Sequence, residues 1–323
     1  MKRQSTMIAC ALAAVSGVLL CLGGCNQSPE VIIYSNADEE SRLAMQDALD
    51  QAGFSGQYIF SSFSTSELGG KIMAEGCNIE ADVITASTYY LKSAQQVHRM
   101  FAPLSFTFHA LEKTPGFCAP LTAQEGAIFI NTRVLQENGL PRPAALKDLA
   151  NPVYKGFISI PNIRSSSTAW LMVQALVATY GEQEAVRILR GMAENAGPHL
   201  ENSGSGPLKK VRAGEVAIAF GLRHQAVADK KAGLPIDYVD PVEGNFMLTE
   251  SVCVTNKGAG TSPQAMKMAQ VLVHDARPGI LKVYPVPLYE GEQAGEEARS
   301  SNVKDFPEPL TVELLKRHQA LMN

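Results

Sequence analysis

The sequence predicts an α/β protein of two lobes, and three observations lead to this prediction. Its 323 residues are enough for two domains. Short β-branched runs alternate with segments of helical periodicity, which favours mostly parallel strands with helices between them. The first three of these runs each end in a loop rich in Ser, Thr or Asn. Ligands of such sheets bind beyond the carboxyl ends of the strands, so the loops indicate a ligand cleft.

The first residues predict an export signal rather than part of the fold. Two basic residues precede an apolar run over residues 7–22. This run is shorter than the roughly 20 residues that a membrane-spanning helix needs. It ends in Leu-Gly-Gly-Cys25, which resembles a bacterial lipobox and implies lipidation of the Cys25 thiol. We therefore expect a signal peptide over residues 1–24, a lipidated tether over 25–30, and an exported body anchored to the membrane.

Composition excludes several classes of protein. Hydrophobic residues make up 46% of the chain, which excludes disorder, and the 28 Lys and Arg against 32 Asp and Glu form no basic block. Nucleic acid is therefore not an expected partner. After the predicted leader only Cys77, Cys118 and Cys253 remain, with no CxxC pair. We expect buried, unreactive cysteines, although one pair could be oxidised and the spacing does not select it.

The first lobe is predicted over residues 31–125, with strands near 31–34, 57–60 and 81–84. A helix follows each strand, and its first turn carries unpaired N–H groups that can bind an oxyanion together with nearby hydroxyls. An alternative is that these hydroxyls only cap their helices. The candidate binding residues here are Ser35, Asn36, Asp38, Ser64, Thr65, Ser66, Ser87 and Thr88.

The second lobe is predicted over residues 126–240, and residues 241–323 return to the first. A strand near 157–161 leads to a Ser/Thr-rich loop and to a helix from Ala169 to Gly181. Another helix spans about 182–194. The candidate binding residues in this lobe are Ser166, Ser167, Thr168, Asn202, Ser203, Arg223 and His224.

Charged groups among the candidates suggest what the ligand carries. Arg223 follows a predicted strand, and Arg is suited to bidentate recognition of carboxylate or phosphate. Arg223 and His224 could equally be an ordinary exposed pair. Glu243 and Glu250 could balance a ligand amine or bind sugar hydroxyls, whereas carboxylates of this kind are more often solvated or paired with a neighbouring base.

The motifs of common enzymes are absent from the sequence. It contains no GxxxxGK[ST] phosphate loop, no GxSxG elbow, no HExxH and no GxGxxG between a strand and a helix. Its six histidines are not paired at metal-ligand spacing. We therefore predict a binding protein with no catalytic residue, metal or cofactor. An exported hydrolase or transferase is the rival interpretation, and turnover of a phosphoester would reveal it.

Several segments resemble a known family. The lipobox, the Val-Ile-Ile-Tyr-Ser start, the stretch 68–76, Ala81-Asp82-Val83 and the Ser-Ser-Thr-Ala before the long helix are similar to substrate-binding proteins of ABC importers. The likeness is to the group that binds ferric ion, 2-aminoethylphosphonate and sugar phosphates. It implies the two-lobed type II periplasmic-binding-protein fold, with crossover strands between lobes that close on the ligand. It also implies a monomer whose partners, a permease and an ATPase, are separate chains.

Departures from the family pattern narrow the predicted ligand. Ferric binders of this group carry adjacent tyrosines where this chain has Arg223 and His224. The resemblance therefore points to a small organophosphorus anion, with 2-aminoethylphosphonate first and a carboxylate of Asp38, Glu243 or Glu250 for its ammonium. Sugar phosphate and ferric ion remain alternatives within the transport role. A sensor subunit that signals to a membrane receptor would share the same sequence features.

Overall fold

The computed structural model describes residues 30–293, 295, 297, 299, 300 and 302–321. The predicted signal peptide, Cys25 and all of the predicted tether except Glu30 lie outside this range. Within it, no helix combines the length and apolar character that a bilayer crossing requires.

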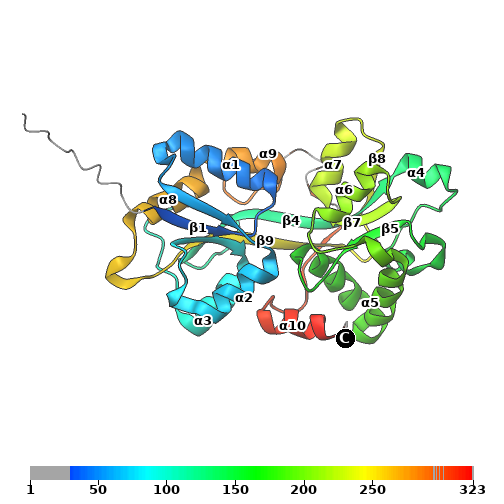
Figure 1. The fold of residues 1–323 in the computed structure, drawn as a ribbon, viewed down its shortest axis with the longest axis horizontal. Helices are drawn as coiled ribbons and strands as arrows, with labels where there is room; N and C mark the ends of the chain where they lie inside the picture. Colours follow the sequence, from blue (N-terminus) through cyan, green and yellow to red (C-terminus); the bar gives the residue numbers. More distant parts are fainter. Residues whose placement is uncertain (1–29, 294, 296, 298, 301, 322–323) are drawn as a thin grey trace, which may run out of the picture.

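One set of strands and helices, which we call lobe 1, has a parallel sheet at its centre (Figure 1). Its strand order is β2-β1-β3, and β9 joins the sheet antiparallel beside β3. Helices α1, α8 and α9 pack together on one side, and α2 and α3 lie on the other. The elements of lobe 1 are β1 (Val31–Ser35), α1 (Glu39–Leu49), β2 (Tyr58–Ser62), α2 (Thr65–Glu75), β3 (Val83–Ser87), α3 (Thr88–His98), α8 (Pro263–His274) and α9 (Arg277–Val283).

The other set, which we call lobe 2, repeats the α/β plan. Strand β7 pairs parallel with β5 and antiparallel with β4, and β5 pairs parallel with β6. The long helix α5 is interrupted at Gly181, whose φ of 76° is left-handed, so the two helices predicted to meet there are present as two arms. The elements of lobe 2 are α4 (Thr132–Glu137), β5 (Ile158–Pro161), α5 (Ser167–Ala196), β6 (Leu200–Glu201), α6 (Gly206–Ala213), β7 (Ile218–Leu222), α7 (Arg223–Lys231) and β8 (Ile236–Val239).

Two long antiparallel strands, β4 (Cys118–Asn131) and β9 (Asn245–Val254), run between the lobes (Figure 1). Strand β4 pairs with β9 from Cys118 to Glu125 and then with β7 from Gly126 onward. A short strand, β10 (Val303–Lys304), pairs with the start of β9. The predicted boundary between residues 125 and 126 thus falls where β4 changes its partner, and we keep it as a proposed boundary.

A disulfide joins the two crossover strands. Cys118 and Cys253 face each other directly in the β4–β9 register and are bonded. Cys77 is exposed. The expectation of buried cysteines is confirmed for Cys118 and Cys253, which form the one oxidised pair that the sequence allowed, and it was wrong for Cys77. The spacing could not select the pair, because only the antiparallel strand pairing places residues 135 positions apart side by side.

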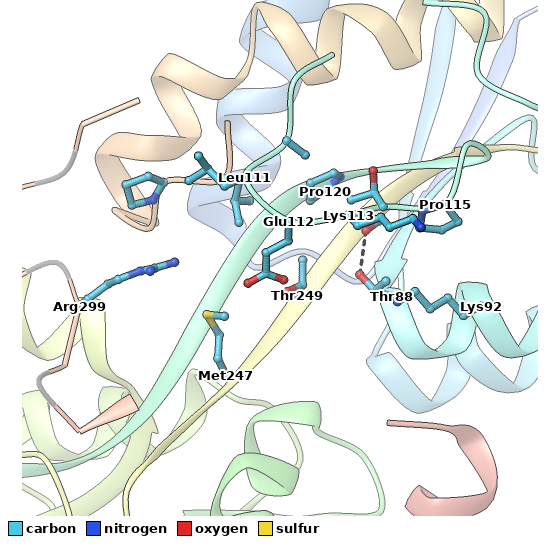
Figure 2. A pocket seen from close by; sticks show the side chains of 15 residues that line it. Thr88, Lys92, Leu111, Glu112, Lys113, Pro115, Pro120, Met247, Thr249 and Arg299 are labelled. Atoms are coloured by element: carbon cyan, nitrogen blue, oxygen red, sulfur yellow. Dashed lines mark hydrogen bonds between the residues drawn. The ribbon is translucent and has the colours of Figure 1, made fainter. Parts of the chain in front are cut away.

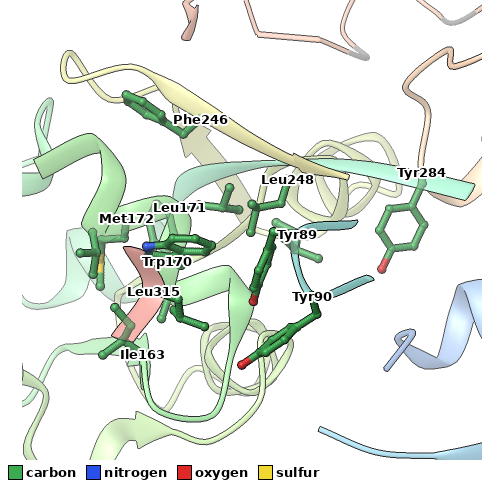
Figure 3. Packing of buried hydrophobic residues seen from close by; sticks show 14 of the residues in the cluster. Tyr89, Tyr90, Ile163, Trp170, Leu171, Met172, Phe246, Leu248, Tyr284 and Leu315 are labelled. Atoms are coloured by element: carbon green, nitrogen blue, oxygen red, sulfur yellow. The ribbon is translucent and has the colours of Figure 1, made fainter. Parts of the chain in front are cut away.

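The last helix, α10 (Val312–Ala320), contacts both lobes (Figure 1). The Val312 amide donates to Ser93 Oγ on α3, and His318 Nδ1 accepts the indole N–H of Trp170 on α5 at 2.8 Å. Beneath the lobe junction, Tyr89 packs edge-on against Trp170 with ring centroids 4.8 Å apart (Figure 3). The apolar core is therefore continuous from one lobe to the other.

Removing the disulfide should destabilise the fold without changing its topology. We expect Cys118→Ala with Cys253→Ala to lower the free energy of unfolding by about 2–4 kcal/mol, because the bond closes a long loop in the unfolded chain. Urea unfolding of the oxidised protein measures this loss. Cys77→Ala is the matched control and should change stability little; an equal loss in the control would contradict the assignment.

Candidate functional site

A cavity of about 120 Å³ lies at the junction of the lobes, beyond the carboxyl ends of β1 and β2. This volume is several times what one water molecule needs. Lobe 1, the crossover strands and lobe 2 all contribute to its walls. The lining residues are Asn36, Ala37, Asp38, Phe63, Ser64, Thr65, Gln124, Ser165, Ser166, Ser167, Thr168, Asn202, Ser203, Gly204 and Glu250.

Two helices start at this cavity, one from each lobe. Ser64 caps α2 in a capping box, in which its hydroxyl accepts from the Glu67 amide while the Glu67 carboxylate accepts from the Ser64 amide. Ser166 caps α5 by accepting from the Thr168 amide at 3.2 Å. Capping satisfies only part of a first turn, so both helices still direct N–H groups and a partial positive charge at the cavity. The arrangement is suited to an oxyanion.

The loop before α6 completes the lobe 2 wall. The Ser203 hydroxyl accepts from the Gly206 amide at 3.0 Å, which fixes the turn into the helix. A Cβ on Gly204 would lie 2.2 Å from Thr168 Oγ1. Glycine is therefore required here, because the loop backbone approaches the start of α5 more closely than a side chain permits.

Two carboxylates, those of Asp38 and Glu250, face the same cavity. Asp38 Oδ2 accepts the Tyr284 hydroxyl at 2.9 Å. Glu250 accepts from Asn36 Nδ2 at 2.9 Å and from the Thr122 hydroxyl at 3.3 Å. Burial raises the pKa of both groups, and the repulsion between them contributes to bringing the pKa of Glu250 to about 7. Because no Lys or Arg is among the described lining residues, a cation in the ligand would relieve this repulsion.

The lobes contact each other directly at the mouth of the cavity. Thr65 Oγ1 of α2 lies 3.3 Å from Ser167 Oγ of α5. The Ser66 hydroxyl donates to the backbone carbonyl of Ser165 at 3.3 Å. These hydrogen bonds join the two helix starts, so the structure represents a closed arrangement of the lobes. Asn36 extends the network, since its Nδ2 also donates to Thr65 Oγ1.

Arg223 does not line the cavity, contrary to the sequence prediction. Its guanidinium binds the Asp240 carboxylate with two hydrogen bonds of 2.7 and 3.1 Å and donates to the Glu297 carbonyl at 2.6 Å. It also lies over the Tyr238 ring. The residue is buried and its donors are occupied within lobe 2 and the C-terminal segment. The prediction failed because Asp240, seventeen residues later, folds back beside it.

Most of the other predicted residues outside the cavity also have structural partners. Glu243 is fully buried and accepts from the Leu146 and Lys147 amides and from the Tyr180 hydroxyl. His224 packs on Tyr284 with ring centroids 4.2 Å apart, and burial lowers its pKa to about 3. It therefore lies one side chain behind Asp38 and is neutral. Four predicted residues remain. Ser35 and Ser87 are buried at the ends of β1 and β3, and the Ser87 hydroxyl has no hydrogen-bond partner among the described residues. Thr88 bonds to Ser251 on the opposite face of β9, and Ser66 bonds to the Ser165 carbonyl at the mouth of the cavity.

Sequence reasoning missed several lining residues. Gln124 is buried in β4, within a strand where every residue is buried, so no alternation marks its side as the cavity side. Phe63 and Ser165 each lie one position before the residue that caps a helix, Ser64 or Ser166, so neither is in the first turn from which the prediction was made. Tyr284, which orients Asp38, comes from a segment 246 residues away, and only tertiary structure brings the two together.

Comparison with known proteins identifies the family. Residues 79–297 match the bacterial extracellular solute-binding proteins. The chain belongs to this family. A protein of Haemophilus influenzae without an assigned function is 32% identical to this solute-binding protein over 116 residues, which are 36% of this chain and 33% of that one. The major ferric iron-binding protein of Neisseria gonorrhoeae is 24% identical over 201 residues, 59% of this chain and 58% of that one. These matches thus span a third to somewhat over half of the curated relatives.

Solved structures confirm the fold class. AfuA of Actinobacillus pleuropneumoniae, a periplasmic binding protein determined with fructose-6-phosphate, superimposes with a TM-score of 0.73 at 18% identity and covers 92% of this chain and 97% of its own. The periplasmic binding protein P5PA gives 0.71 at 18% identity, with 90% and 94% covered. This solute-binding protein therefore has the predicted two-lobed fold, and the resemblance to the ferric and sugar-phosphate group is confirmed at the level of family.

Replacing Glu250 should alter how stability depends on pH. A carboxyl whose folded pKa is raised from 4.5 to about 7 holds its proton better when folded, so the wild type loses stability as pH rises between these values. Glu250→Gln cannot ionise. We therefore expect its free energy of unfolding to gain on the wild type between pH 5 and pH 8, by at most about 3 kcal/mol because one pKa unit is worth about 1.4 kcal/mol.

Urea unfolding without ligand at the two pH values measures this gain. Glu290→Gln, at an exposed position, is the control and should follow the wild type. A pH-independent difference between Glu250→Gln and the wild type would show that the buried carboxyl does not titrate in this range.

Proposed function

We propose that this protein is the substrate-binding subunit of an ABC importer and captures a small zwitterionic organophosphorus compound, with 2-aminoethylphosphonate as the best candidate. One observation carries the proposal: two helix N-termini with their hydroxyls share one small cavity with the half-buried Asp38 carboxylate and the buried Glu250 carboxylate. Helix N-termini favour an oxyanion, and carboxylates that lack a cationic partner favour a cation. A zwitterion with both groups satisfies the two halves of the site together.

The phosphonate would bind at the starts of α2 and α5. There Thr65, Ser167 and Thr168 offer hydroxyl and backbone donors without a cationic side chain. Neutral donors alone would leave a simple anion beside Asp38 and Glu250, which repel it. The ligand ammonium removes that repulsion, and it should lower the pKa of both carboxyls on binding.

Ligand capture and lobe closure are one event in this proposal. The anion bridges α2 of lobe 1 and α5 of lobe 2, so the closed form gains contacts that an open form lacks. The direct Thr65–Ser167 and Ser66–Ser165 hydrogen bonds add to the closed form even without ligand. A permease and an ATPase on separate chains would recognise the closed shape. Lipidation at Cys25 would keep this monomer at the membrane surface.

A ligand panel tests the proposal directly. Isothermal titration calorimetry should give micromolar or tighter binding for 2-aminoethylphosphonate and weaker binding for ethylphosphonate, which lacks the ammonium. Fructose-6-phosphate, thiamin and ferric citrate complete the panel because structures of similar fold carry these ligands in their names, and inorganic phosphate tests the oxyanion alone. Preferential binding of fructose-6-phosphate would retain the oxyanion site and assign the carboxylates to sugar hydroxyls. Preferential binding of ferric citrate would overturn the proposal.

Variants separate the two halves of the site. Asp38→Asn and Glu250→Gln should each weaken 2-aminoethylphosphonate about 10- to 100-fold, since a hydrogen bond to a charged group is worth about 1.5–3 kcal/mol, and leave ethylphosphonate binding nearly unchanged. Thr65→Ala and Ser167→Ala should weaken both ligands to a similar degree. Ser62→Ala, on an exposed position of β2, is the control and should bind like the wild type. Equal losses for both ligands in the carboxylate variants would contradict the ammonium assignment.

A further inference from the structure

A second cavity, of about 90 Å³, lies on the opposite face of the crossover strands (Figure 2). It is walled by the start of α3, by the loop around residues 110–115, by β9 and by the C-terminal segments near Leu288 and Arg299. We call it the hinge-face cavity. It shares no lining residue with the cavity between the lobes.

The pleat of β9 separates the two cavities. Successive side chains of a strand point to opposite faces. Glu250 therefore reaches the cavity between the lobes, whereas Met247, Thr249 and Ser251 reach the hinge-face cavity. The floor of the hinge-face cavity carries a hydroxyl pair, because Thr88 Oγ1 lies 2.8 Å from Ser251 Oγ (Figure 2).

Three cations from separate parts of the chain border the hinge-face cavity. Lys92 comes from α3, Lys113 from the loop, and Arg299 from the C-terminal segment (Figure 2). Among the described residues, Lys92 and Lys113 form no ion pair, and Arg299 acts electrostatically on the Glu125 carboxylate, which does not line the cavity. The one acidic residue in the lining is Glu112. The local charge is therefore positive, opposite in sign to that of the cavity between the lobes.

The rest of the wall is apolar and held in place. Leu111, a residue that is 57% exposed, lines the cavity together with Pro115 and Leu288. The Leu111 amide donates to the Leu288 carbonyl at 2.9 Å, and the Glu292 carboxylate accepts from the Leu288 amide while binding Arg277. The two segments that form this wall are thus fixed to each other and to α9 before any ligand arrives.

From this combination we infer that the hinge-face cavity binds a small organic anion with an apolar body. Lys92 and Lys113, which lie on the side of the Thr88–Ser251 hydroxyl pair, receive the charged group, and these hydroxyls donate to it (Figure 2). The body of the ligand lies against Leu111, Leu288 and Met247. Burial of apolar surface then adds to electrostatic attraction, which exposed cations alone supply only weakly. This site is separate from the proposed transport function and does not depend on it.

The fluorescent anion 8-anilinonaphthalene-1-sulfonate is the probe for this site. Its fluorescence should rise saturably with the folded protein and fall when benzoate is added, whereas benzamide and benzylamine, which share the ring but lack the negative charge, should displace it poorly. Lys92→Met and Lys113→Met should each weaken the probe about 5- to 10-fold, and the double variant more. Lys155→Met, at an exposed position in lobe 2, is the matched control and should leave the affinity unchanged.

A variant of the other cavity excludes the alternative location. Thr65→Trp fills the space between the lobes and should leave probe affinity unchanged, with circular dichroism and the unfolding midpoint reporting that each variant is folded. Loss of probe binding in Thr65→Trp, or unchanged affinity in the Lys92→Met, Lys113→Met double variant, would overturn the inference. Displacement by benzamide as effective as by benzoate would overturn it too. None of these results alters the test of phosphonate binding.

Discussion

The structure depends on the pairing of β4 with β9. These two strands are shared by both lobes, and their register from Cys118–Cys253 to Glu125–Met247 fixes how the lobes sit on one another. The disulfide joins the two strands at the lobe 1 end of the pair. From Gly126 onward β4 pairs with β7 and so becomes part of lobe 2. The side chains that β4 and β9 direct into the junction depend on this register, because a shift of one residue would exchange the two faces of the strands.

That constraint gives the two faces of the ribbon opposite chemistry. On one face Glu250 joins Asp38 in a cavity where helix starts supply the positive potential and burial raises the pKa of both carboxyls. On the other face Thr249 and Ser251 line the hinge-face cavity, which the cationic side chains of Lys92, Lys113 and Arg299 border. The first cavity therefore suits a zwitterion and the second a simple organic anion. The proposed ligands differ in charge because the two faces of the strand pair carry different charged groups.

Family membership explains the fold, whereas the side chains at the cavity decide which ligand binds. AfuA and P5PA superimpose over most of this chain at 18% identity, which shows that the two-lobed frame tolerates extensive sequence change. A frame of this kind carries different ligands by changing side chains at the loops. Here the buried Arg223 illustrates the point, since a charged side chain near the junction is committed to Asp240 and not to a ligand. The position of a residue in the shared fold therefore does not by itself show that the residue binds the ligand.

The sequence by itself determined what depends on neighbours along the chain. Strand and helix alternation, the break of α5 at Gly181 and the caps at Ser64 and Ser166 follow from local propensity, and these placed most hydroxyls of the cavity correctly. Tertiary structure decided the rest: the Cys118–Cys253 bond, the Tyr284 contact to Asp38 and the pairing of Arg223 with Asp240. A side chain's partner across the fold depends on register and on how segments return, and short-range spacing carries neither.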